Sequence, residues 1–109
     1  MVLTTVGSVQ QTGPVEIDTL TIDTGGSTAQ VLLSDAGNDF GTAGAGVTIV
    51  QAGDVALTDA DSMDVDGINS GGLVTLVVGG TAAGGTETLS LSGGVTAVDG
   101  LSLEGDAEG

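Results

Sequence analysis

The chain contains no lysine, arginine or histidine, and it also lacks cysteine, tryptophan and tyrosine. Without histidine, lysine or cysteine, the usual pairs that activate a serine or cysteine nucleophile are excluded. The same absence excludes the ordinary ligand sets of zinc, haem and iron–sulfur clusters, and it leaves no cationic side chain to hold a phosphoryl group. The composition therefore predicts a protein that is not an enzyme.

Fifteen aspartate and glutamate residues stand without a compensating cation, so the formal net charge is −15. Binding to nucleic acid requires Lys or Arg to displace counterions, and anionic membrane surfaces attract basic segments. The longest strongly apolar run, residues 73–78, is too short to span a bilayer, and residues 1–6 do not have the basic start of a signal peptide. We therefore expect no nucleic acid and no membrane, and predict a homo-oligomer or a larger protein assembly.

A chain of 109 residues is one domain by length, and its 39% hydrophobic content lies above that of disordered proteins. Phe40 is its one aromatic residue, so the core must be built from small aliphatic side chains. The 21 glycines add backbone entropy that folding must overcome. We therefore expect neighbouring molecules to contribute to its stability.

Apolar and polar residues alternate with period two in several short segments that are separated by Gly-Gly pairs. Leu20 and Ile22 alternate with Thr21 and Asp23, and Leu89 and Leu91 flank Ser90 in the same way. Such alternation is typical of strands with one buried face. The pattern predicts a single all-β domain over 1–109, a small antiparallel β-sandwich or barrel with Gly-rich turns. Residues 1–6 are predicted to form an apolar N-terminal arm, and residues 104–109 a flexible acidic tail.

Two pairs of segments resemble each other. Residues 18–22 are followed by Gly25-Gly26, as residues 87–91 are by Gly93-Gly94, and residues 17–23 resemble residues 98–104. The two intervals differ, whereas a regular solenoid has a fixed period. An irregular β-solenoid is therefore the alternative to the sandwich.

Four carboxylates are concentrated in a short segment: Asp59, Asp61, Asp64 and Asp66. Carboxylate oxygens are the ligands that calcium prefers, so these residues are the candidate metal site. Their spacing is not that of an EF-hand, and a solvated strand edge kept from self-pairing by its charge is the alternative. No cofactor other than calcium is predicted.

Residues 20–27, Leu-Thr-Ile-Asp-Thr-Gly-Gly-Ser, resemble the active-site strand and turn of the aspartic proteases. That resemblance implies a dimer in which Asp23 pairs with its symmetry mate and shares one proton to activate water. The alternative is a strand that ends in a Gly-Gly turn.

These observations together predict a non-enzymatic structural assembly protein. The most concrete hypothesis is a virion component such as a capsid decoration or cement protein, which rests on analogy at the level of fold and size. The alternative is an extracellular filament, surface-layer or adhesin module, located outside the cell or at its surface and stabilised by calcium. A remote alternative is a dimeric aspartic-protease-like enzyme that uses Asp23.

Overall fold

The computed structural model describes residues 2–17, 19–26, 28–35, 37–40, 46–60, 63–78, 89–91 and 93–104. In these residues every regular element is a β-strand. The strands are, in chain order, β1 (Val2–Thr4), β2 (Val9–Gln10), β3 (Leu20–Asp23), β4 (Val31–Leu33), β5 (Val47–Ala52), β6 (Val55–Asp59), β7 (Met63–Ser70), β8 (Leu73–Val78), β9 (Leu89–Leu91), β10 (Val95–Ala97) and β11 (Gly100–Glu104).

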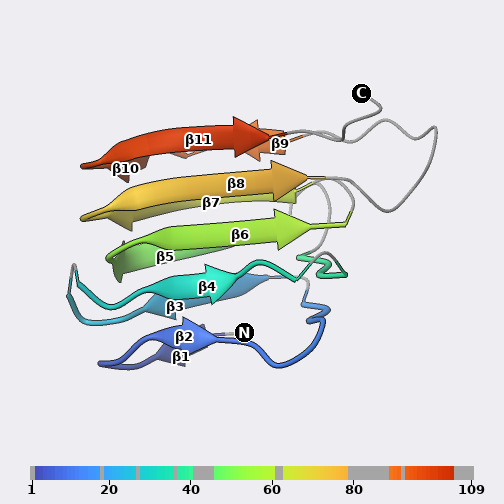
Figure 1. The fold of residues 1–109 in the computed structure, drawn as a ribbon, viewed down its shortest axis with the longest axis horizontal. Coiled ribbons are helices and arrows are strands. Elements are labelled where there is room, and N and C mark those ends of the chain that lie inside the picture. The colour runs from blue at the N-terminus through green and yellow to red at the C-terminus, as the bar shows by residue number, and fades with distance from the viewer. Residues whose placement is uncertain are drawn as a thin grey trace.

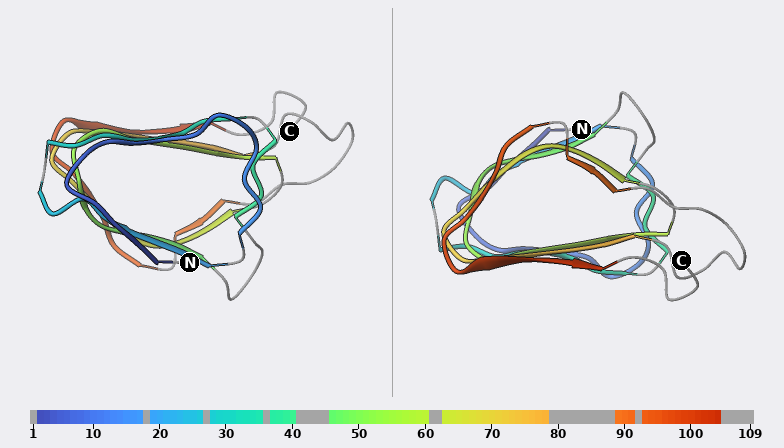
Figure 2. Two further views of the ribbon diagram at one scale, coloured as in Figure 1. Left: turned by 90° about the horizontal axis from the view of Figure 1, so that it is seen from below. Right: turned by 90° about the horizontal axis from the view of Figure 1, so that it is seen from above.

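The strands form two sheets that face each other along the whole molecule (Figure 1). Sheet A has the order β1-β3-β5-β7-β10, with β9 also paired to β7, and sheet B has the order β11-β8-β6-β4-β2. The chain passes from sheet A to sheet B and back, so successive turns superpose when viewed along the stacking axis (Figure 2). This arrangement is a parallel β-solenoid.

We divide the solenoid into five coils by their strands. Coil 1 covers residues 2–17 with β1 and β2, and coil 2 covers residues 20–40 with β3 and β4. Coil 3 covers residues 47–60 with β5 and β6, and coil 4 covers residues 63–78 with β7 and β8. Coil 5 covers residues 89–104 with β9, β10 and β11.

The predicted antiparallel sandwich or barrel is wrong, because all strand pairs among the described residues are parallel. An antiparallel hairpin pairs strands that are neighbours in the sequence. Here such neighbours do not pair with each other: they lie in opposite sheets, except β9 and β10, which both pair with β7. Each strand instead pairs with the strand one coil away. Thr21 pairs with Val2, 19 residues earlier, but Thr48 pairs with Thr21, 27 residues earlier. The coils therefore differ in length, and the path is that of the irregular β-solenoid that sequence analysis placed second.

The core consists of columns of aliphatic side chains that run through all five coils. Parallel pairing places residues of the same column directly above one another, with their side chains on the same face of the sheet. Ladder A, on the inner face of sheet A, is Leu3, Ile22, Ile49, Ile68 and Val95. Ladder B, on the inner face of sheet B, is Val9, Val31, Val55, Val74 and Leu101. Phe40, fully buried, also belongs to the core.

The predicted strand phase is correct in β3 but needs a correction in coil 5. Leu20 and Ile22 are buried, and Thr21 between them is partly exposed. Leu91 faces inward because it pairs with the buried Val65, yet it remains 40% exposed. The reason is its position in the last coil, where no further described coil covers the inner face. An inward position in coil 5 is therefore less sensitive to substitution than the period-two pattern indicates.

The two predicted terminal segments are described only in part. Residues 2–4 of the proposed N-terminal arm form β1, which pairs with β3 of the same chain. Glu104 is the last residue of β11, and residues 105–109 of the predicted tail lie outside the described residues, as does Met1.

Strand β7 contains a β-bulge at Asp66. Val47 pairs with Val65, but the next residue, Thr48, pairs with Gly67, so Asp66 has no opposite residue in β5. On the other side of β7, Gly93 lies so close to the Asp66 carbonyl group that an added Cβ atom would overlap it. Only glycine fits at position 93, because the obstacle is backbone and cannot rotate away.

We expect Gly93→Ala to lower the free energy of unfolding by roughly 1–3 kcal/mol, the usual cost of forcing extra atoms into a filled space. The matched control is Gly94→Ala, because a Cβ atom there meets nothing within 4 Å. That control should be neutral or slightly stabilising, since alanine restricts the unfolded chain more than glycine does. Urea denaturation of both variants checks the difference, and equal effects would contradict the close approach.

Candidate functional site

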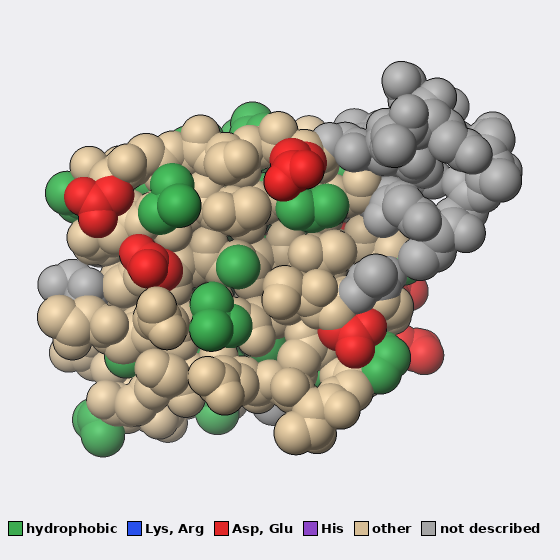
Figure 3. Space-filling view, in the orientation of Figure 1, with side chains coloured by type: hydrophobic (Ala, Val, Ile, Leu, Met, Phe, Trp, Pro, Cys, Tyr) green, Lys and Arg blue, Asp and Glu red, His purple; other side chains and the backbone are tan. Residues whose placement is uncertain are grey.

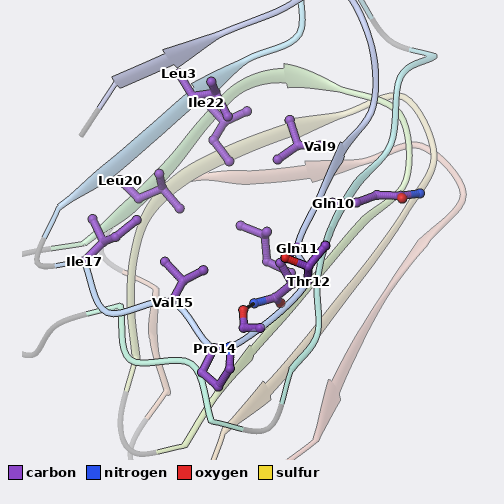
Figure 4. A pocket seen from close by; sticks show the side chains of 12 residues that line it. Leu3, Val9, Gln10, Gln11, Thr12, Pro14, Val15, Ile17, Leu20 and Ile22 are labelled. Atoms are coloured by element: carbon purple, nitrogen blue, oxygen red, sulfur yellow. Dashed lines mark hydrogen bonds between the residues drawn. The ribbon is translucent and has the colours of Figure 1, made fainter.

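The N-terminal end of the solenoid is hollowed by an open pocket of about 480 Å³. Most of its wall is formed by inward-pointing aliphatic side chains of coils 1 and 2 (Figure 4). They include Leu3, Val9, Val15, Ile17, Leu20 and Ile22. The pocket is the inner space between the two sheets, open on the side of coil 1 where the described residues place no further coil. It contains no charged lining residue among those described.

The lining residue Gln11, which is partly buried, forms an amide pair with Asn38, which does not itself line the pocket. The Asn38 side chain is fully buried, and its Oδ1 atom accepts hydrogen bonds from Gln11 Nε2 at 2.7 Å and from the Val15 backbone N–H at 3.0 Å. Its Nδ2 atom donates to Gln11 Oε1 at 2.9 Å and to the Leu33 carbonyl at 3.0 Å. Both donors and both acceptor sites of the Asn38 amide are therefore occupied.

Gln11 is satisfied in the same way. Its Oε1 atom also accepts a bond from the Asp35 backbone N–H at 3.0 Å, and its Nε2 atom also donates to the Gly13 carbonyl at 2.8 Å. The backbone carbonyl of Asn38 accepts a further bond from Ala60 N–H at 2.7 Å. The amide pair thus joins coils 1 and 2, and the Asn38 backbone extends the connection to coil 3.

We expect Gln11→Ala to lower the free energy of unfolding by roughly 1–3 kcal/mol, because it leaves buried polar groups of Asn38 without their partner. The matched control is Gln10→Ala in the exposed neighbouring glutamine, which should change stability by less than about 0.5 kcal/mol. Thermal or urea unfolding of the two variants measures the difference. Equal losses would show that the amide pair does not hold coil 1 to coil 2.

The C-terminal end of the solenoid exposes side chains that an interior coil would bury. Leu101 pairs with Val74 and Leu103 with Leu76, so both leucines face inward, yet they are 44% and 50% exposed. Among the described residues, six of the eight exposed large hydrophobic side chains belong to coils 1 and 5. These six are Val2, Val6, Leu91, Val98, Leu101 and Leu103. The apolar surface of the molecule is therefore concentrated at its two ends.

The negative charge is distributed unevenly along the chain. Residues 2–15 contain no charged side chain, and the described part of coil 5 carries only Asp99 and Glu104. Eight of the fifteen carboxylates lie between Asp23 and Asp66, in the middle of the chain. The face formed by sheet B shows carboxylates scattered singly rather than gathered in a patch (Figure 3). The N-terminal end is thus the region where a close approach costs the least electrostatic repulsion.

The structure does not gather the three described members of the predicted calcium site in one place. Asp59 is fully buried on the inner side of sheet B, where its Oδ2 atom accepts a hydrogen bond from the Phe40 backbone N–H at 2.8 Å. Asp64 and Asp66 alternate with buried residues on the outer face of sheet A. Asp61 lies outside the described residues. No group of three acidic side chains within the described ranges is arranged as metal ligands are, and the calcium site stays a prediction.

The Asp-Thr-Gly segment forms a corner between β3 and the next part of coil 2. The Asp23 Oδ1 atom accepts a hydrogen bond from Gly25 N–H at 2.8 Å, and Gly25 has a positive φ of 73°. The buried Thr24 hydroxyl lies within 3.0 Å of the carbonyl oxygens of Gly26 and Gln51. These contacts explain the three residue types as a turn, which is the alternative that accompanied the protease resemblance.

No family model, no curated protein and no solved structure matches this chain. The part of the chain that the structure describes contains no helix that could cross a membrane.

Sequence analysis missed the residues that define the two ends. It includes Val6 in the apolar N-terminal arm and Val98 in the segment that resembles residues 17–23, but it assigns no role to Gln11 or Asn38. A column analysis could have found Val6 and Val98, because each follows its Ladder A residue by three positions. Nothing in the sequence indicates that Gln11 and Asn38, 27 positions apart, form one amide pair.

Proposed function

We propose that this chain is a non-enzymatic structural module, a short stack of coils that forms part of an extracellular filament, surface layer or adhesin. The observation that carries the proposal is the continuity of Ladders A and B through all five coils. A stack of this kind grows in one direction, by about 4.8 Å for each added coil. Such a module sets a distance and transmits tension, and neither task requires a catalytic group.

The positions of the first and last coils support the same role. Coil 1 and coil 5 lie at opposite ends of the stacking axis (Figure 1). A pull applied through the two ends of the chain therefore crosses every interface between coils. The outer strand positions are rich in threonine and serine, which suit an exposed sheet surface.

A filament or adhesin module is favoured over a virion component by the direction of growth. A solenoid adds length along one axis, which is the geometry of a stalk or fibre rather than of a shell. The capsid decoration protein stays a prediction that no feature of the solenoid favours, and calcium has no part in the proposal.

We expect a single chain held by handles at its two ends to unfold coil by coil, because each coil of a solenoid contacts only its neighbours. Paired residues are 19 positions apart between coils 1 and 2, and 27 positions apart between coils 2 and 3. At about 3.4 Å per extended residue, the steps should measure about 65–90 Å. Single-molecule force spectroscopy measures the length of each step. A single step that releases the whole chain would contradict unfolding coil by coil.

Two neighbouring residues provide the control for this measurement. Ile49 belongs to Ladder A and is buried, whereas Thr48 beside it is partly exposed. Ile49→Ala should lower the force at which the middle coils unfold, because it leaves a cavity that costs roughly 2–5 kcal/mol. Thr48→Ala should leave the force of each step unchanged.

Asp23→Asn separates the structural role from the remote protease alternative. Asparagine keeps the oxygen that accepts the Gly25 N–H bond, so the free energy of unfolding should change by at most roughly 1 kcal/mol. Two aspartates that share one proton are assayed under mildly acidic conditions, so cleavage of acid-denatured haemoglobin is measured at about pH 4.5, with and without pepstatin. Neither protein should show pepstatin-sensitive cleavage. Cleavage by the wild type that Asp23→Asn abolishes would replace the structural proposal with the enzymatic one.

A further inference from the structure

We propose that copies of this chain stack head to tail, with coil 1 of one copy seated on coil 5 of the next. The inference rests on the proposed structural role and names its partner, a second copy of the chain. The contact would extend both sheets across the boundary between copies and cover the open pocket at the N-terminal end.

The exposed strand edges at the two ends have the polarity that this contact needs. In sheet A, β1 is the edge strand at one end and β10 the edge strand on the described path at the other, and in sheet B these strands are β2 and β11. All pairs in both sheets are parallel. A second copy shifted along the stacking axis, without rotation of its strands, therefore presents parallel edges to parallel edges. Unpaired strand edges of this kind readily add a further strand.

The two end coils also match in register. Val9 in Ladder B follows Leu3 in Ladder A by six residues, and Leu101 follows Val95 by the same six. Coils 3 and 4 have the same separation of six, and only coil 2 departs from it, with nine residues from Ile22 to Val31. Because coils 1 and 5 have the same number of residues between Ladder A and Ladder B, Leu3 can stand over Val95 while Val9 stands over Leu101. Both ladders then continue from one copy into the next.

The most exposed apolar side chain of each end coil lies at the same position relative to the Ladder A residue of that coil. Val6 follows Leu3 by three residues, and Val98 follows Val95 by three. Val6 is 95% exposed and Val98 is 71% exposed. In the stacked arrangement the two valines lie against each other across the boundary. The contact thus gives an apolar neighbour to two side chains that the single chain leaves in water.

The size and charge of the two end coils bear on this contact. Specific interfaces use about 20–30 residues on each side. The two end coils, residues 2–17 and 89–104, are each somewhat shorter than this. Residues 2–15 carry no carboxylate, whereas residues 99–109 carry four, so a head-to-tail contact sets a charged end against an uncharged one. Contact between two copies of the C-terminal end would instead bring two sets of Asp99 and Glu104 together and oppose the strand directions. The head-to-tail contact does not close on itself, so it produces open filaments rather than dimers.

The experiment measures the mass of the purified full chain by sedimentation over a range of protein concentrations. It compares low salt with about 1 M NaCl, where the Debye length falls to about 3 Å and the remaining repulsion between copies is screened. We expect the mass to rise above 10.3 kDa with concentration, and to rise more strongly at high salt. Three variants receive the same Val→Glu change: Val6→Glu at the N-terminal end, Val98→Glu at the C-terminal end, and Val50→Glu on the middle strand β5.

Val50 is the matched control because it is also exposed, at 43%, but lies in coil 3 away from both ends. Val50→Glu should form filaments as the wild type does. Val6→Glu and Val98→Glu should each remain at 10.3 kDa. Mixed in equal amounts, these two variants should give one complex of twice that mass, because each retains the end that the other has lost.

Three results would overturn the proposal. The first is a wild type that stays monomeric at high salt and high concentration. The second is association that Val50→Glu reduces as strongly as the end variants do. The third is self-association of one end variant, which would indicate contact between like ends. In all three cases the stepwise unfolding of a single chain would still test the structural role, since that measurement involves no second copy.

Discussion

The stacking of coils in parallel register is the constraint on which the rest of this structure depends. Because each residue lies above its partner one coil away, an inward aliphatic side chain is packed by residues of the same column. Ladders A and B are the result, and they allow a core with one aromatic residue to be continuous through five coils. The same register decides which side chains remain uncovered, since only the first and last members of each column lack a neighbour.

Departures from the regular register are accommodated by particular residues. The extra residue Asp66 in β7 leaves room for nothing larger than glycine at position 93 in the coil above. The buried polar groups of the corner near β2 and β4 are satisfied by the reciprocal bonds of Gln11 and Asn38. A chain with no cations cannot use ion pairs between side chains for this purpose, so amides, hydroxyls and backbone groups perform it.

The surface follows from the same arrangement. Carboxylates in the middle coils can point outward on a sheet face, where water solvates them, whereas residues 2–15 carry none, and both end coils expose apolar side chains. The molecule therefore has an acidic body with exposed apolar side chains at both ends. The body resists lateral association through its charge, and the ends are the surfaces where the backbone itself offers further pairing.

The sequence by itself determined that the protein is all-β, which residues of β3 face inward, and which catalytic and metal-binding chemistries its composition excludes. These properties depend on local alternation and on residue types, which are readable one segment at a time. Only the tertiary structure decided that the strands pair in parallel, that Gln11 meets Asn38, and that Asp59 lies inside while Asp64 and Asp66 lie outside. Those facts depend on which segment lies one coil away, and coils of 19 and 27 residues have no fixed period from which that distance could be read.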